Sequence, residues 1–213
     1  MAHPNEDPED EGALLARVRA GDEAAFASLV RRHQQDVYRL ALRMLGQPSE
    51  AEDVAQEVFV SLFLNAGKFE GRARLSTWLY RVTVNHCHNR LRYLRRRGHG
   101  RHRALEAGDT ERAAGQGVLG GAPLGQPPPR PEQALEGRQL AEALRAALDT
   151  LGEEHRTLLV LRDLEQLSYE RICEITQLPL GTVKSRLHRA RLALARALQA
   201  QQQRAPRRRN GHG

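Results

Sequence analysis

A break in the middle of the chain constrains its fold more than any other sequence feature. Of the 213 residues, positions 95–131 include eight glycines and five prolines and show little helical periodicity. Such a segment cannot bury enough apolar surface to offset the entropy lost when it becomes ordered. We therefore expect two modules joined by a flexible linker at 96–131, with an acidic disordered start at 1–12 and a basic disordered tail at 199–213.

On both sides of the break, apolar residues recur at helical spacing, and the alternation typical of strands is nearly absent. We expect helices at about 13–19, 22–45, 49–65, 75–96, 135–151, 154–164, 168–176 and 180–198. The predicted fold class is therefore all-α, with two small helical domains at 13–95 and 132–198.

Local signals mark several helix ends. Asp22 stands where an N-cap is expected, and Gly46 and Pro48 are expected to end the same helix. Ser49 and Glu52 have the spacing of a capping box. These residues predict where two successive helices begin and where the first of them ends.

The charge of the chain is positive and unevenly spread. The net charge is +7 at pH 7, yet residues 6–11 hold five acidic side chains and no Lys or Arg. The rest of the chain has 33 basic against 21 acidic residues. Such an excess favours a polyanionic partner, because each cation placed on a phosphate releases condensed counterions. Nearly all of the basic residues are arginine, which suits forked contacts to phosphate and guanine, although a GC-rich genome would favour the same codons.

Cysteine content and hydropathy exclude other classes of protein. Cys87 and Cys173 are the only cysteines, so no disulfide framework is indicated. No apolar run approaches the roughly 20 residues that span a bilayer, and an acidic start is the opposite of a signal peptide. We expect a cytoplasmic protein without membrane insertion.

A metal or redox enzyme built on His86, Cys87 and His88, with His99 and His102, is an alternative. Adjacent residues on a helix point about 100° apart, so His86 and Cys87 do not readily share one ion. The chain has no CxxC motif and no second ligand pair of suitable spacing. We therefore expect no cofactor, no metal site and no catalytic residue.

Residues 167–194 carry the strongest local signal: a capped helix, a turn at 176–179 and a longer helix, which is the order of a helix-turn-helix. One face of the second helix is apolar, formed by Val183, Leu187, Ala190 and Leu194. Its other faces carry Lys184, Ser185, His188, Arg189 and Arg191. An apolar back and a basic front suit insertion into the DNA major groove. An ordinary amphipathic surface helix with solvated charges is the alternative.

The segments LSYERICEI (167–175) and LGTVKSRLHRAR (180–191) resemble region 4 of extracytoplasmic-function (ECF) sigma factors. The resemblance implies that this domain reads the promoter element near −35 while it contacts the flap of the polymerase β subunit. The side chains it places on DNA are Lys184, Ser185, His188 and Arg189. It makes Arg186 a phosphate contact, and Thr182 lies at the helix start, where free backbone amides also bind phosphate.

The segment AEDVAQEVF (51–59) resembles sigma region 2.2, which binds the clamp helices of polymerase β′. The resemblance makes Asp53, Gln56 and Glu57 contacts to core polymerase. Complementary charge at such a surface sets orientation and association rate more than affinity. The alternative is a solvated acidic face.

The next stretch mixes stacking and basic side chains: Phe69, Arg72, Arg74, Trp78, Tyr80, Arg81, Asn85, Arg90 and Arg92. Single-stranded DNA binds to such a combination, because rings stack on bases and cations pair with the backbone. The stretch resembles sigma regions 2.3 and 2.4, which melt and read the −10 element. By this resemblance Asn85 lies at the floor of a pocket for a flipped base, and the loop 68–75 helps to select that base. Trp78 as a core residue is the alternative.

The loop 68–75 departs from the family pattern at one residue. Glu70 stands where the family often has arginine. A carboxylate there repels phosphate, so the −10 preference is not predicted.

Together these resemblances predict a sigma factor that binds core RNA polymerase and directs promoter-specific initiation without catalytic activity of its own. The family also implies an anti-sigma partner. A flexible linker of this length spans roughly 30–36 Å on average and about 120 Å when extended, enough for promoter elements about 70 Å apart. The alternative is an autonomous helix-turn-helix regulator that binds duplex DNA without polymerase.

Overall fold

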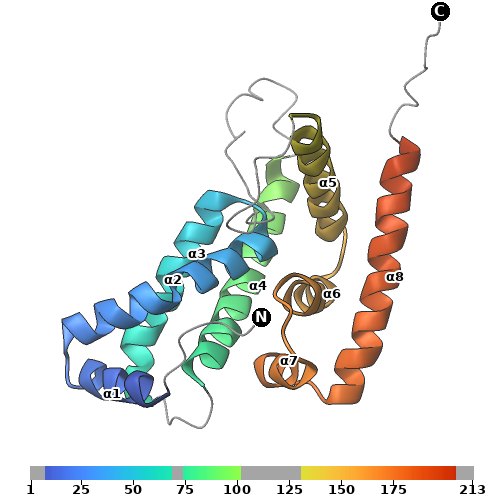
Figure 1. Ribbon diagram of the computed structural model, residues 1–213. Helices are drawn as coiled ribbons and strands as arrows, with labels where there is room; N and C mark the ends of the chain where they lie inside the picture. The colour runs from blue at the N-terminus through green and yellow to red at the C-terminus, as the bar shows by residue number, and fades with distance from the viewer. Residues whose placement is uncertain (1–7, 69–73, 102–130, 205–213) are drawn as a thin grey trace, which may run out of the picture. The chain divides into compact units, whose positions relative to one another are not determined.

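The computed structural model describes residues 8–68, 74–101 and 131–204, in which the only regular elements are helices (Figure 1). These helices form two compact units, α1–α4 and α5–α8. The all-α, two-domain prediction is therefore confirmed. The predicted linker lies mostly outside the described residues.

The first unit is built from four helices. They are α1 (Pro8–Arg19), α2 (Glu23–Leu45), α3 (Pro48–Asn65) and α4 (Leu75–Arg101), with a 3₁₀ turn at Ala66–Lys68 after α3. Helix α2 packs against α1, α3 and α4, and α3 packs against α4. The core lies between them and holds the fully buried side chains of Leu29, Leu40, Met44, Leu62 and Leu79. Burial of each such side chain contributes about 1.5–3 kcal/mol.

The second unit is smaller. It contains α5 (Pro131–Asp149), α6 (Glu153–Leu159), a π-helical turn (Val160–Leu164), α7 (Tyr169–Thr176) and α8 (Leu180–Arg204). Helix α8 packs against α5 and α6. Its core includes Leu158, Leu161, Ile172, Val183 and Leu187, which are at most 1% exposed.

The Asp22 cap and the Gly46 end of α2 are as expected. The Oδ1 atom of Asp22 accepts a hydrogen bond from the backbone N–H of Ala25 at 3.0 Å, and Arg17 lies 2.7 Å from the same carboxylate. The hydrogen bond from Ala25 and the nearby Arg17 lower the pKa of Asp22. Gly46 ends the helix with a φ of 75°, a left-handed conformation that glycine adopts without steric cost.

The capping box expected at Ser49 and Glu52 is wrong. The N-cap of α3 is Gln47, without a side-chain cap, and Pro48 is the first helical residue. Proline fits this position because its φ is already helical and the N–H it lacks would have had no partner there. Pro48 therefore begins α3 rather than ending α2, and Ser49 lies within the helix.

Several helices extend beyond their predicted ends. Helix α1 begins at Pro8, so residues 8–12 are helical rather than disordered. Within this stretch, Glu11 Oε1 lies 2.7 Å from Nε2 of the buried His33. Helix α4 extends through Arg101, and α5 begins at Pro131. Residues 199–204 of the predicted tail continue α8, since Ala, Gln and Arg favour helix.

Candidate functional site

Helices α7 and α8 form the predicted helix-turn-helix. The hydroxyl of Ser168 accepts a hydrogen bond from the backbone N–H of Arg171 at 3.2 Å and caps α7. Gln177 follows α7 with a φ of 58°, which turns the chain before α8 begins at Leu180. Val183 and Leu187 are buried, so the apolar back of α8 faces the core of the second unit.

The front of α8 carries four of the side chains predicted to contact DNA. Lys184, Ser185, His188 and Arg189 are all exposed, and their spacing places them on one side of the helix. Thr182 is half-buried in the first turn. This surface has the size and chemistry of a major-groove reader, and contact of each residue with DNA stays a prediction.

Two other arginines of α8 are engaged within the second unit. Arg186 Nη1 lies 2.6 Å from Glu154 Oε2, and Arg191 Nε donates to Asp163 Oδ2 at 3.1 Å. The hydrogen bonds that Arg191 donates to the Asp163 carboxylate raise the pKa of Arg191. These two contacts connect α8 to α6 and to the π-helical turn. A phosphate contact by Arg186, as predicted, would compete with its ion pair.

Tyr169 at the start of α7 lies beneath two cations. Arg162 Cζ stands 4.6 Å and Lys184 Nζ 5.6 Å from its ring centroid, distances at which a cation is attracted to the ring. The Lys184 ammonium is therefore oriented by α7, although its side chain stays exposed.

Four of the residues predicted to open DNA share one stripe that starts just before α4 and runs along it. Arg74, Trp78, Arg81 and Asn85 follow the helical spacing of three and four, and the backbone N–H of Trp78 donates to Arg74 O at 3.2 Å. Arg74 and Asn85 are exposed, while Trp78 and Arg81 are half-buried. The stripe lies opposite the buried face of α4 and presents one ring between cationic and amide groups.

Of the other three residues of this predicted set, only Tyr80 lies among the described residues. Tyr80 is 5% exposed and belongs to the buried face of α4 with Leu79 and Cys87. Its predicted stacking on a base is not supported, because the helical register turns its ring inward. Phe69 and Arg72 lie outside the described residues. So does Glu70, the residue that departs from the family pattern.

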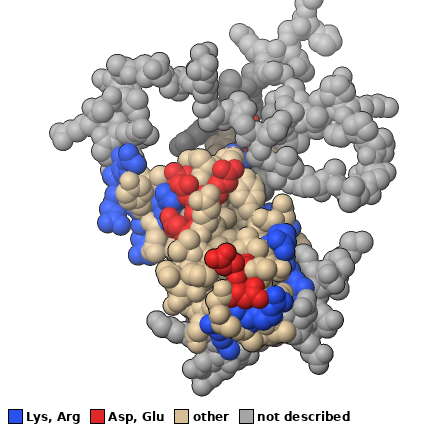
Figure 2. All heavy atoms as spheres, turned by 90° about the vertical axis from the view of Figure 1, so that its left-hand side faces the viewer, with Lys and Arg blue, Asp and Glu red and all other residues tan. Residues whose placement is uncertain are grey.

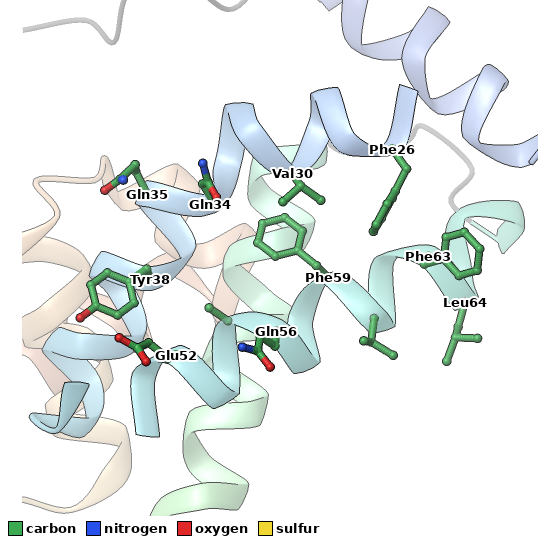
Figure 3. A pocket seen from close by; sticks show the side chains of 12 residues that line it. Phe26, Val30, Gln34, Gln35, Tyr38, Glu52, Gln56, Phe59, Phe63 and Leu64 are labelled. Atoms are coloured by element: carbon green, nitrogen blue, oxygen red, sulfur yellow. The ribbon is translucent and has the colours of Figure 1, made fainter. Parts of the chain in front are cut away.

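The residues predicted to contact polymerase are exposed on α3, but two of them are also engaged with α4. Arg90 Nη2 lies 3.4 Å from Asp53 Oδ2 and 3.1 Å from Glu57 Oε1. His86 Nδ1 lies 2.9 Å from Glu57 Oε2. Gln56 instead lines the groove between α2 and α3 (Figure 3). By its position in the sequence Arg90 falls among the DNA-opening residues, because the register of α3 against α4 is not visible in the sequence.

A groove between α2 and α3 was not predicted. Phe26 and Val30 of α2 face Phe59 and Phe63 of α3, with Leu64 at the end of the groove (Figure 3). The rings of Phe26 and Phe63 meet edge to face with centroids 5.3 Å apart. Glu52 and Gln56 add a polar edge.

The groove borders a patch of exposed apolar side chains on α3. Val60, Phe63 and Leu64 are 58%, 53% and 71% exposed. Figure 2 shows one face of the first unit, where acidic side chains form separate groups on a largely uncharged surface. The sequence contained a signal for this patch, because these large apolar residues do not fall on the core face of α3. A cluster of exposed apolar side chains is typical of a binding surface.

The enzyme alternative finds no support among the described residues. Cys87 is fully buried, and burial, with a smaller effect of Glu57, raises its pKa to about 12. The thiolate, which is the form that binds metals and attacks substrates, is therefore disfavoured. Within the described ranges, no group of His, Cys, Asp and Glu side chains is arranged to hold a metal ion, and no helix there has the length and apolarity to cross a membrane.

The chain is similar to known proteins over both units. The Sigma-70 region 2 family matches residues 29–97, and the family described as Sigma-70, region 4 matches residues 141–194. The ECF RNA polymerase sigma factor SigW of Bacillus subtilis is 34% identical over 86% of this chain and 94% of its own. The RNA polymerase sigma-H factor of Pseudomonas aeruginosa is 36% identical over 90% of this chain and 95% of its own.

Two solved structures share the fold. CnrH, solved in complex with the cytosolic domain of CnrY, has a TM-score of 0.56 at 22% identity and covers 90% of this chain and 98% of its own. RpoE from Bartonella quintana, solved with the anti-sigma factor NepR, has a TM-score of 0.55 at 21% identity and covers 82% of this chain and 96% of its own. Since the sequence relatives match along nearly the whole of both chains, this protein belongs to the ECF sigma factors of bacterial RNA polymerase.

Proposed function

We propose that the two units of this sigma factor divide the work of promoter-specific initiation. Helix α3 binds core polymerase, the outward stripe of α4 stabilises melted DNA at the −10 element, and the front of α8 reads the −35 element. The protein supplies specificity, the polymerase supplies the chemistry, and the chain itself catalyses no reaction. Its site of action is the cytoplasm.

The observation that carries this proposal is the surface of α3. Asp53 and Glu57 are exposed on α3, the helix that also supplies Phe59 and Phe63 to the apolar groove, and Glu52 and Gln56 form the polar edge of that groove. An apolar centre with a charged rim is the usual composition of a protein–protein interface. The groove fits a helix with an apolar ridge, and the carboxylates fit basic residues on its flank. An autonomous helix-turn-helix regulator would need only α7 and α8, so this alternative leaves the α3 surface without a purpose.

The proposal is tested by run-off transcription with core polymerase that lacks a sigma subunit, on genomic fragments. We expect discrete transcripts only when the chain is added, with start sites that share −35 and −10 elements. Stable binding of the chain alone to such fragments, without association with core polymerase, would favour the autonomous regulator.

We also propose an anti-sigma partner. CnrH and RpoE, which share the fold, were each solved with a second protein. A partner that covers the groove at Phe26 and Phe63 would exclude core polymerase by occupying the same apolar surface. Competition between such a protein and core polymerase for the labelled chain would test this mechanism.

Substitution of Arg189 by alanine is expected to lower affinity of the holoenzyme for a −35 element by about 1–3 kcal/mol and to relax the preference at one base pair. The exposed guanidinium stands on the front of α8, where a bidentate contact to guanine is available. The measurement is competition binding with duplexes that vary at each −35 position. Arg196→Ala, an exposed change farther along α8, is the control. An unchanged base preference in the Arg189 variant would remove this residue from the reading surface.

A further inference from the structure

Arg90 on α4 joins three carboxylates of α3. Its guanidinium lies 3.2 Å from Glu50, 3.4 Å from Asp53 and 3.1 Å from Glu57, measured from the nearest nitrogen to the nearest oxygen. We call these three acidic residues the carboxylate row. The side chain of Arg90 is only 20% exposed, whereas those of Asp53 and Glu57 are 58% and 48% exposed. The cation is therefore largely enclosed, and two of its partners stay open to solvent.

The spacing of the carboxylate row explains why it needs a cation. Residues 50, 53 and 57 are three and four positions apart, so their like charges lie one above the other on α3 and repel. Guanidinium stays protonated and presents five N–H groups in a fixed planar fork, which lets one side chain serve several carboxylates. A lysine ammonium is a compact point charge and lacks this geometry.

Glu57 is oriented from two sides. Its Oε1 atom faces Arg90, and its Oε2 atom faces His86 Nδ1 at 2.9 Å. The other ring nitrogen of His86, Nε2, lies 3.1 Å from the hydroxyl of Ser61. The Glu57 side chain, which would sample several rotamers alone, is thus fixed by neighbours on α3 and α4. Fixing a side chain before binding removes an entropic cost from the binding step.

We propose that Arg90 is a positioning residue for the binding of core polymerase: it holds Asp53 and Glu57 in the orientation in which they meet basic side chains of the polymerase. This inference rests on the proposed function of α3. Arg90 is enclosed between α3 and α4 and acts through the carboxylates. The resemblance to sigma region 2.2 implies polymerase contacts for Asp53 and Glu57. It implies no such role for Arg90.

The test is the equilibrium affinity of the labelled full-length chain for core polymerase at low and moderate salt. Arg90→Gln removes the cation and keeps a shorter polar side chain, and we expect affinity to fall about tenfold, the cost of ordering two freed side chains on binding. Arg90→Lys should recover only part of the loss. Arg96→Gln, a matched change on an exposed part of the same helix, should bind like the original chain.

A double-mutant cycle separates positioning from a general effect on folding. Asp53→Asn with Glu57→Gln removes the groups on which Arg90 acts, so adding Arg90→Gln to this pair should weaken binding no further. If Arg90 only supported the fold, Arg90→Gln would lower the affinity of the double variant by as much as it lowers that of the original chain. Thermal unfolding of each variant is followed by circular dichroism. The binding affinities of the cycle are compared at a temperature below the lowest unfolding midpoint.

The outcomes distinguish the two proposals. If Arg90→Gln binds as tightly as the original chain or more tightly, or if its effect adds to that of the pair, the positioning role is overturned while polymerase binding by α3 stands. If the Asp53/Glu57 pair has no effect, the assignment of these carboxylates fails, and the inference fails with it. If the unaltered chain does not bind core polymerase, the proposed function itself is wrong.

Discussion

Replacing Trp78 with alanine is expected to reduce promoter opening by roughly 5- to 150-fold while binding at the −35 element stays nearly unchanged. One base stacked on an aromatic ring is worth about 1–3 kcal/mol, which corresponds to that range. Trp78 is the aromatic residue of the outward stripe on α4, with Arg74 and Asn85 one turn and two turns away. Unstacking a base costs a few kcal/mol, so losing one stacking surface shifts the balance toward closed DNA.

Opening is measured by the reactivity of unpaired thymines to permanganate, and upstream binding by footprinting of the closed complex at low temperature. Trp78→Phe keeps an aromatic face and should retain most of the opening activity. Thermal unfolding of both variants shows whether the half-buried ring also supports the first unit. An equal loss of opening and of −35 binding would contradict the division of labour between the two units.

Replacing Leu187 with alanine is expected to destabilise the second unit by about 2–5 kcal/mol, the usual cost of removing a buried leucine side chain. Leu187 is 1% exposed on the apolar back of α8, and the smaller side chain leaves a cavity in a unit with few core residues. Recognition of the −35 element should be lost on warming, although every side chain on the front of α8 is intact. Urea unfolding followed by circular dichroism measures the effect.

Leu192→Ala is the control for this prediction. Leu192 is 48% exposed on the same helix, and a surface change of this kind usually shifts stability by about 0.5 kcal/mol or less. A Leu187 variant as stable as the Leu192 variant would mean that α8 is not held by its apolar back.

The sequence predicted those features that depend on neighbours along the chain. The Asp22 cap, the left-handed Gly46 and the apolar back of α8 at Val183 and Leu187 each follow from contacts within one or two helical turns. The same local pattern placed Lys184 and Arg189 on the exposed front of α8. Such signals persist in the sequence because helix geometry fixes which residues share a face.

Predictions failed where two local signals competed or where a long-range contact decided. Pro48 is the first residue of α3, so the capping box expected at Ser49 does not form. The fixed φ of proline is a strong local constraint that favours this position. The pairing of Glu11 with His33, 22 residues away, accompanies a helical start to α1 that the acidic composition did not predict. Tyr80 looked like a stacking residue by type, but the register of α4 buries it.

The sequence by itself determined most of the helices, their division into two units and the exposed front of α8. Only the tertiary structure showed that Arg90 of α4 pairs with carboxylates of α3, and that Phe26 of α2 meets Phe63 of α3 across a groove. The physical reason is the range of the interactions. Helix periodicity follows from bonds between residues four apart, whereas contact between helices depends on their packing angle and relative register, which many weak interactions set together.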